Sequence, residues 1–135
     1  MILLDTHVLI WWANGDRERL SATANKHIDA AADPSNEQQL LVSAISCWEL
    51  SMLVKRGRVA LGIDTERWLR LVAEVPAVRL LPLDPMVAMA ATTIPEPFHA
   101  DPADRFLVAQ ARSLGVPLIT ADAKIRDYSH VQSLW

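Results

Sequence analysis

Short runs of apolar residues, each followed by a segment with helical spacing, constrain the fold of this chain more than any other feature. Residues 1–4, 40–42 and 118–119 are apolar without alternation, as expected for strands that are buried on both faces of a parallel sheet. Strands that alternate with helices predict an α/β protein, in which helices cover both faces of a mostly parallel sheet.

Helix start and stop signals divide the rest of the chain. Asp101 and Pro102 are a favourable cap and first helical residue, and Gly115 is a typical stop. The predicted helices span residues 6–13, 21–32, 45–55, 64–75, 84–92 and 101–114. We also expect a short strand over residues 78–81, an edge strand at Val131 and a short turn over residues 121–124.

Length and composition fit one globular domain that spans residues 1–135. Hydrophobic residues make up 51% of the chain and charged residues 21%, which excludes a disordered chain. The single cysteine, Cys47, cannot form an intramolecular disulfide, and the N-terminal segment lacks the basic residues of a signal peptide. No apolar stretch is long enough to span a bilayer. We therefore expect a cytoplasmic protein without a membrane partner.

Four acidic residues are expected to meet at one edge of the predicted sheet. Asp5 follows the first apolar run, and Asp122 follows the apolar run at 117–120. Glu49 and Asp104 lie near the starts of two predicted helices. Ligands of open α/β sheets bind at the carboxyl ends of the strands. Converging carboxylates repel each other unless a cation neutralises them, and oxygen ligands suit Mg²⁺ or Mn²⁺, so the pattern favours phosphoryl chemistry.

Each of these acids also has an ordinary structural explanation. Asp5 and Asp122 could each cap a short helix. Ser46 and Glu49 have the spacing of a capping box. Asp104 would be favourable in the first turn of its helix because of the helix dipole. The joint placement of the four acids is therefore more specific than any one of them.

Glu49 fits a purely structural role least well. Ile45, Trp48, Met52 and Leu53 form a predicted apolar stripe, and Glu49 shares that face by its spacing. A glutamate that faces a core needs a partner, because an unpaired buried charge is costly. A cation shared with other carboxylates would provide one.

Charge and the remaining aromatic residues give weaker indications. The formal net charge of −3 argues against a simple basic nucleic-acid binder. The cluster at residues 55–58 suits either phosphate contact or a solvated helix end. We expect Trp48 and Trp68 in the core, one of the adjacent residues Trp11 and Trp12 on a partner surface, and His99 beside the acids rather than as a ligand.

Four segments of the chain, taken in order, resemble the PIN-domain ribonucleases, and within them the VapC-type toxins of type II toxin–antitoxin systems. The segments are Met-Ile-Leu-Leu-Asp-Thr-His at residues 1–7, Ser-Ala-Ile-Ser-Cys-Trp-Glu-Leu at 43–50, His-Ala-Asp-Pro-Ala-Asp-Arg-Phe-Leu-Val-Ala-Gln-Ala at 99–111 and Pro-Leu-Ile-Thr-Ala-Asp at 117–122. The resemblance covers nearly the whole chain. One minor departure is Ala103, where relatives often carry an aromatic residue.

The resemblance implies a three-layer α/β/α sandwich with a mostly parallel central sheet. It also implies a quartet of catalytic and metal-binding residues around Mg²⁺ or Mn²⁺, formed by Asp5, Glu49, Asp104 and Asp122. The residues expected to support this site are Thr6, Ser46, Asp101 and Thr120. The implied partners are an RNA substrate, a second copy in a homodimer and a small VapB-type antitoxin.

The sequence therefore predicts a metal-dependent endoribonuclease that is the toxin of a toxin–antitoxin pair. Two alternatives stay open. One is a nuclease that selects DNA by its structure. The other is a PIN domain that binds nucleic acid without cleaving it, although the intact quartet argues against that alternative.

Overall fold

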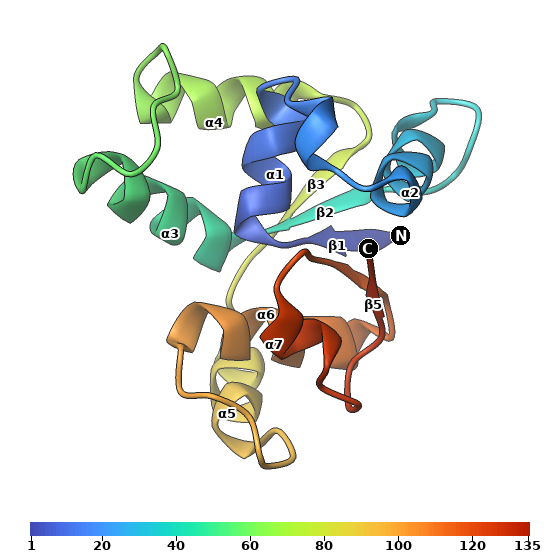
Figure 1. The fold of residues 1–135 in the computed structure, drawn as a ribbon, viewed down its shortest axis with the longest axis vertical. Coiled ribbons are helices and arrows are strands. Elements are labelled where there is room, and N and C mark those ends of the chain that lie inside the picture. Colours follow the sequence, from blue (N-terminus) through green and yellow to red (C-terminus); the bar gives the residue numbers. More distant parts are fainter.

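A single five-stranded parallel sheet forms the centre of the computed structural model, which describes residues 1–135 (Figure 1). The spatial order of the strands is β3-β2-β1-β4-β5, and every neighbouring pair is parallel. The strands are β1 (Ile2–Leu4), β2 (Leu40–Ser43), β3 (Val78–Leu81), β4 (Leu118–Ile119) and β5 (Ser133–Leu134). The chain thus starts in the middle of the sheet, so that β1 is covered on both sides by neighbouring strands.

Seven α-helices and one short 3₁₀ helix connect the strands. They are α1 (Thr6–Ala13), η1 (Arg17–Arg19), α2 (Ala22–Ala32), α3 (Ala44–Lys55), α4 (Thr65–Glu74), α5 (Pro85–Thr93), α6 (Pro102–Leu114) and α7 (Ala123–Arg126). The predicted helix boundaries are confirmed to within two residues, because the capping residues mark most of the helix ends.

Two apolar cores lie on the two faces of the sheet. Ile2 and Leu4 of β1 face the core that α1, α2 and α4 cover, whereas Leu3 faces the core that α5, α6 and α7 cover. Alternate side chains of a strand point to opposite faces, which is why a run of three apolar residues serves both cores. Figure 1 shows the two helical layers above and below the sheet. The predicted three-layer α/β/α fold is confirmed.

Helix α3 lies between these two layers. Its Ile45 belongs to the α5–α6–α7 core and its Leu50 to the α1–α2–α4 core. The predicted apolar stripe of this helix is wrong in one position, because Trp48 is 50% exposed instead of buried. Trp68, by contrast, is buried as predicted, and its ring nitrogen donates to Asn14 Oδ1 at 2.9 Å.

Two local predictions need correction, and one short element was not predicted. The last strand begins at Ser133 rather than at Val131, because Val131 packs against the apolar core and the chain pairs with β4 two residues later. Residues 123–126 form the short helix α7, where only a turn was expected. The sequence analysis did not predict the 3₁₀ turn over residues 17–19.

None of the helices combines the length and the apolar character that crossing a bilayer requires.

The core side chain of Leu107 anchors α6 to the sheet, because Leu107 is fully buried. We expect Leu107→Ala to lower the free energy of unfolding by about 3 kcal/mol through lost burial and the remaining cavity. Leu114→Ala is the matched control on the same helix, since Leu114 is 49% exposed. Urea denaturation measures both. Equal losses in the two variants would contradict the assigned packing of α6.

Candidate active site

The carboxyl ends of the two central strands place two acids side by side. The backbone N–H of Asp5, which follows β1, donates to the carbonyl oxygen of Ile119 at the end of β4. Its carboxylate caps α1 by accepting from the Thr6 N–H at 2.7 Å. Asp122 follows β4 by three residues and caps α7 by accepting from the Lys124 N–H at 2.9 Å.

Helices α3 and α6 bring two further acids to the same edge of the sheet. Glu49 lies in the second turn of α3 and is half-buried. Asp104 lies in the first turn of α6, where its backbone N–H donates to the capping carboxylate of Asp101 at 3.2 Å. A hollow of about 380 Å³ results, and it is lined by Asp5, His7, Trp11, Glu49, Asp101, Asp104, Ala121 and Asp122. We call it the acidic hollow.

Asp5 is the most enclosed of these acids, with 7% of its surface exposed. Its Oδ2 accepts a hydrogen bond of 2.6 Å from the Thr120 hydroxyl. The buried hydroxyl of Thr6 donates to Ser46 Oγ at 3.0 Å, which ties α1 to α3 beside the carboxylate. Burial raises the pKa of Asp5, and the hydrogen bonds from Thr120 and Thr6 oppose that rise.

Asp104 shows most clearly that the acids repel each other. Burial, followed by the charges of Asp5, Asp101, Asp122 and Glu49, raises the pKa of Asp104 to about 8. The pKa of Glu49 is also raised, mainly by burial, while the nearby Thr6 hydroxyl opposes the rise. Asp104 therefore holds a proton near neutral pH unless a cation takes its place. The donor set consists of carboxylate oxygens, which suits a hard divalent cation.

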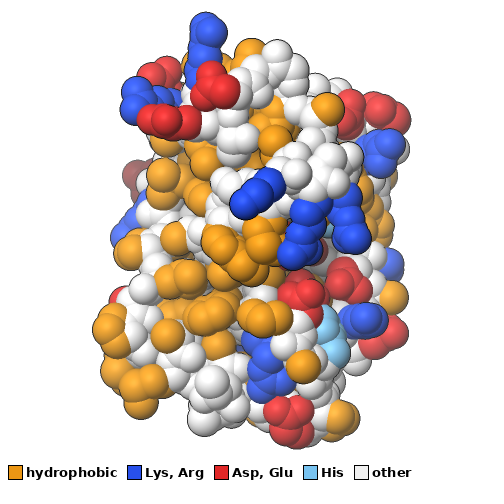
Figure 2. Space-filling view, turned by 90° about the vertical axis from the view of Figure 1, so that its left-hand side faces the viewer, with side chains coloured by type: hydrophobic (Ala, Val, Ile, Leu, Met, Phe, Trp, Pro, Cys, Tyr) orange, Lys and Arg blue, Asp and Glu red, His pale blue; other side chains and the backbone are white.

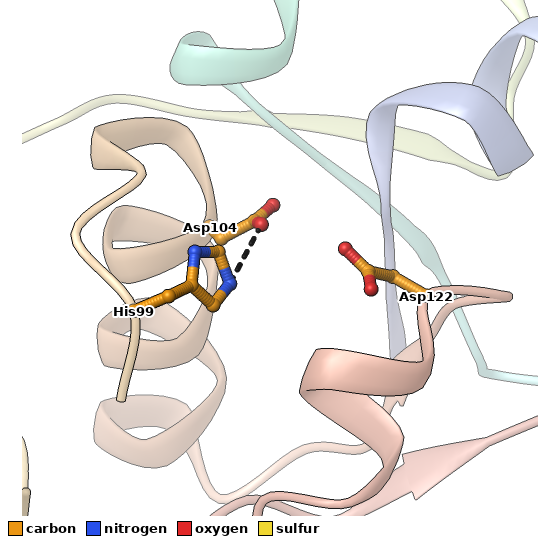
Figure 3. A group of neighbouring side chains, drawn as sticks. All are labelled: His99, Asp104 and Asp122. Carbon is orange, nitrogen blue, oxygen red and sulfur yellow. Dashed lines mark ion pairs between the residues drawn. The ribbon is translucent and has the colours of Figure 1, made fainter. Parts of the chain in front are cut away.

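Asp104 and Asp122 of the hollow form a close group with His99, which lies beside it. One atom each from His99, Asp104 and Asp122 lies within 4.8 Å of the others. Figure 3 shows the carboxylates of Asp104 and Asp122 facing the space between α6 and the start of α7, with the His99 ring beside Asp104. His99 Nε2 is 3.1 Å from Asp104 Oδ2, so the ring lies beside the acids, as expected from the sequence.

The structure brings together all four acids that the sequence singled out. The supporting residues Thr6, Ser46 and Thr120 are fully buried next to them, and Asp101 lies exposed as the cap of α6. The sequence analysis missed His7 and Trp11, which also line the hollow. Their positions at the first and second turns of α1, directly after Asp5, were the available signal.

The suggested capping box in α3 is wrong. Ser43, not Ser46, caps this helix, since its hydroxyl accepts from the Ile45 N–H at 3.1 Å. Ser46 therefore lies inside the helix and is free to bond Thr6. Glu49 does not close the helix start and instead faces the acidic hollow.

Basic side chains accompany the acids on the surface. Figure 2 shows several lysine and arginine side chains directly above a group of acidic side chains and a histidine. The C-terminal end of α3 contributes exposed Lys55 and Arg56, followed by exposed Arg58. Basic side chains near a group of acids on one face are suited to a phosphate backbone that approaches a cation.

The strand order and the acidic hollow together define an α/β protein whose candidate site lies at the carboxyl edge of a parallel sheet. The chain belongs to the PIN-domain family, whose family model matches residues 2–131. The predicted resemblance to PIN-domain ribonucleases of the VapC type is confirmed by this match and by one relative. Ribonuclease VapC22 of Mycobacterium tuberculosis is 38% identical over 129 residues, which cover 96% of this chain and 92% of that protein.

Solved structures show the same fold. VapBC2 from Rickettsia felis, in a structure with a DNA fragment from its promoter, has a TM-score of 0.70 at 12% identity. The match covers 98% of this chain and 97% of the VapBC2 chain. FitAcB from Neisseria gonorrhoeae has a TM-score of 0.62 at 24% identity, over 98% of this chain and 96% of its own. At these identities the likeness supports the fold alone.

The raised pKa of Asp104 gives a pH dependence of stability. Between about pH 4 and about pH 8 the folded protein keeps a proton on Asp104 that the unfolded chain has lost. The free energy of unfolding, measured in EDTA by urea denaturation, should therefore be higher at about pH 5 than at about pH 8.

Asp104→Asn should flatten this dependence, because it removes the titrating group that faces the other acids. Glu37→Gln, a change in an exposed loop, is the matched control and should leave the dependence as it is. A metal-free protein that is equally stable at both pH values would contradict the crowding of carboxylates described above.

Proposed function

We propose that this chain is a divalent-cation-dependent endoribonuclease and the toxin of a toxin–antitoxin pair. The observation that carries the proposal is the convergence of Asp5, Glu49, Asp104 and Asp122 in one hollow, with the pKa of Asp104 raised to about 8. The identity to Ribonuclease VapC22 supports RNA as the substrate. Cytoplasmic action, where RNA is accessible, is part of the same proposal.

The four acids would hold Mg²⁺, or Mn²⁺ in its place, with Asp101 and His99 at the edge of the site. The fit rests on the donor set, which offers several carboxylate oxygens, and on repulsion that a cation would relieve. When bound, such a cation neutralises phosphate charge and lowers the pKa of an attacking water. Asp104 gives up its proton on binding, so affinity should rise with pH.

The residues of the chain position the reacting groups. Thr120 and the Thr6 N–H hold the Asp5 carboxylate in one orientation, and the Lys124 N–H holds that of Asp122. One carboxylate of the quartet accepts the proton of the water that attacks phosphorus. The bond from phosphorus to the 3′ oxygen breaks, and this oxygen takes a proton from solvent. The products are a 5′-phosphate and a 3′-hydroxyl.

An antitoxin and a second copy of the chain would cover exposed apolar surface. Most of the exposed large apolar side chains lie on α3, α4, β3 and α5, namely Trp48, Leu71, Leu80, Met86 and Met89. Figure 2 shows hydrophobic side chains spread over much of one face. Exposed apolar area of this kind marks interaction sites. A toxin–antitoxin complex from Klebsiella pneumoniae has this fold, with a TM-score of 0.64 at 17% identity.

The proposal is tested by cleavage of end-labelled single-stranded RNA and transfer RNA by protein freed of any bound antitoxin. We expect cleavage with Mg²⁺ or Mn²⁺, none in EDTA, and a loss of at least about a hundredfold in Asp104→Asn, which keeps the shape and removes the charge. Glu37→Gln should cleave at the wild-type rate.

Four results would point elsewhere. Cleavage that persists in Asp104→Asn indicates a contaminating nuclease. Products with 2′,3′-cyclic phosphate ends would exclude attack by water. Cleavage of matched DNA but not of RNA, or metal-independent RNA binding without any cleavage, would favour the alternative nuclease or the binding domain.

Thr120 provides a separate test of the cation site. We expect Thr120→Val to lower Mn²⁺ affinity about 10- to 100-fold, because Asp5 loses the hydroxyl that orients it. Thr120→Ser keeps that hydroxyl and is the matched control. Isothermal titration calorimetry with Mn²⁺ measures both variants. Unchanged Mn²⁺ affinity in Thr120→Val would indicate that Asp5 does not bind the cation.

A further inference from the structure

A second and larger hollow lies next to the acidic one. Its volume is about 640 Å³, within the size range of small-ligand pockets, and its walls come from the segment before α6 and from the segment that includes and follows α7. Aromatic side chains of Phe98, His99, Tyr128 and His130 line it, together with Lys124. We call it the aromatic pocket. Apart from His99 and the backbone N–H of Lys124, the proposed cleavage chemistry uses none of these residues.

The aromatic rings form one connected series. The ring centroids are 4.4 Å apart for Phe98 and His99, 4.6 Å for Phe98 and Tyr128, and 5.4 Å for Tyr128 and His130. Core packing accounts for Tyr128, which is buried, and for the covered part of Phe98, which packs against the same core, but not for His130, which is exposed. The series therefore presents aromatic surface to a pocket that is open to solvent.

Both walls of the aromatic pocket are tied to helix α6. Arg105 donates to the carbonyl oxygens of Ala91, Phe98 and His99. Arg112 donates to the carbonyl oxygen of His130. The Tyr128 hydroxyl adds a bond of 2.5 Å to the carbonyl oxygen of Pro95. A pocket whose walls are fixed in this way loses little conformational entropy when a ligand binds.

Two residues connect the aromatic pocket to the acidic hollow. The His99 ring lines the aromatic pocket, while its Nε2 lies 3.1 Å from Asp104 Oδ2. Lys124 also lines the aromatic pocket, while its backbone N–H donates to Asp122 Oδ1. The exposed Lys124 side chain is thus a cation located where a phosphate chain would pass from one hollow to the other.

We propose that the aromatic pocket binds one base of single-stranded RNA, next to the phosphate that is cleaved. The base would stack on the Phe98 and His130 rings, and Lys124 would contact the adjoining phosphate. Unstacked bases are recognised by stacking on aromatic side chains, which tolerates all four bases and still favours some of them. This inference rests on the proposed nuclease function and adds a determinant of RNA choice to it.

The test uses NMR spectroscopy on the full chain in EDTA, titrated separately with AMP, CMP, GMP, UMP and ribose 5-phosphate. We expect the ring resonances of Phe98, Tyr128 and His130 to shift with at least one nucleotide, which should bind about tenfold more tightly than ribose 5-phosphate because only the nucleotide has a base to stack. His130→Ala and Lys124→Ala should each weaken that nucleotide about tenfold. Both residues are exposed, so neither change should disturb folding.

Arg126→Ala is the matched control, since Arg126 is an exposed basic residue of α7 that does not line the aromatic pocket. It should bind the nucleotide as the wild type does. Ring resonances that stay unmoved with all four nucleotides would overturn the inference. Ribose 5-phosphate that binds as tightly as the nucleotides would overturn it as well, because it would indicate a phosphate site without base recognition.

The binding measurement involves no cleavage, so it separates this inference from the proposed function. Nucleotide binding in a protein that cuts no RNA would contradict the nuclease proposal and leave base binding by the aromatic pocket supported. RNA cleavage with an unchanged KM in His130→Ala and Lys124→Ala would contradict the pocket and leave the nuclease proposal supported. A higher KM with an unchanged kcat in His130→Ala is the result we expect.

Discussion

The burial of the Asp5 carboxylate at the end of the central strand is the constraint on which the rest of the candidate site depends. Strand β1 lies between β2 and β4. Asp5, the residue that follows β1, therefore lies at the middle of the carboxyl edge of the sheet. A carboxylate there must be satisfied, and the Thr120 hydroxyl and the Thr6 N–H satisfy it from two different elements. The remaining negative charge lies close to the neighbouring acids, and a bound cation would neutralise it. The fold therefore determines the position of Asp5, and the proposed cation site depends on it.

Two of the four acids of the proposed site, Asp5 and Asp122, also cap helices, and this explains how well their positions could be predicted. The sequence analysis weighed Asp5 and Asp122 either as helix caps or as site residues. The structure shows that both cap helices and line the acidic hollow. The two explanations agree because a parallel strand that leads into a helix ends at the carboxyl edge, where the first helical N–H groups need an acceptor. Local sequence therefore located the acids correctly, although their roles are still a proposal.

The errors arise where tertiary contacts decide the outcome. The spacing in α3 groups Trp48 with Ile45, yet α3 lies between two layers and buries Ile45 and Leu50 on different sides, so Trp48 points to solvent. The aromatic pocket was also beyond the reach of sequence, because Phe98 and His130 are brought together by contacts from α6 and not by any spacing along the chain. A helix cap depends on residues that are close in sequence, whereas the face that a helix buries depends on the elements that pack against it.

The two arginines of α6 bond to main-chain carbonyl oxygens of the segments that carry Phe98, His99 and His130. Every residue type presents a carbonyl oxygen, so these contacts survive when the side chains around them are exchanged. The bonds to positions 98, 99 and 130 are therefore independent of the side chains there, whereas the Tyr128 hydroxyl contributes to the frame through its own side chain. New side chains at positions 98 and 130 can therefore be introduced without moving Asp104, which lies on α6 with the two arginines. These two positions are a natural place to change the choice of RNA while the acidic hollow stays unchanged.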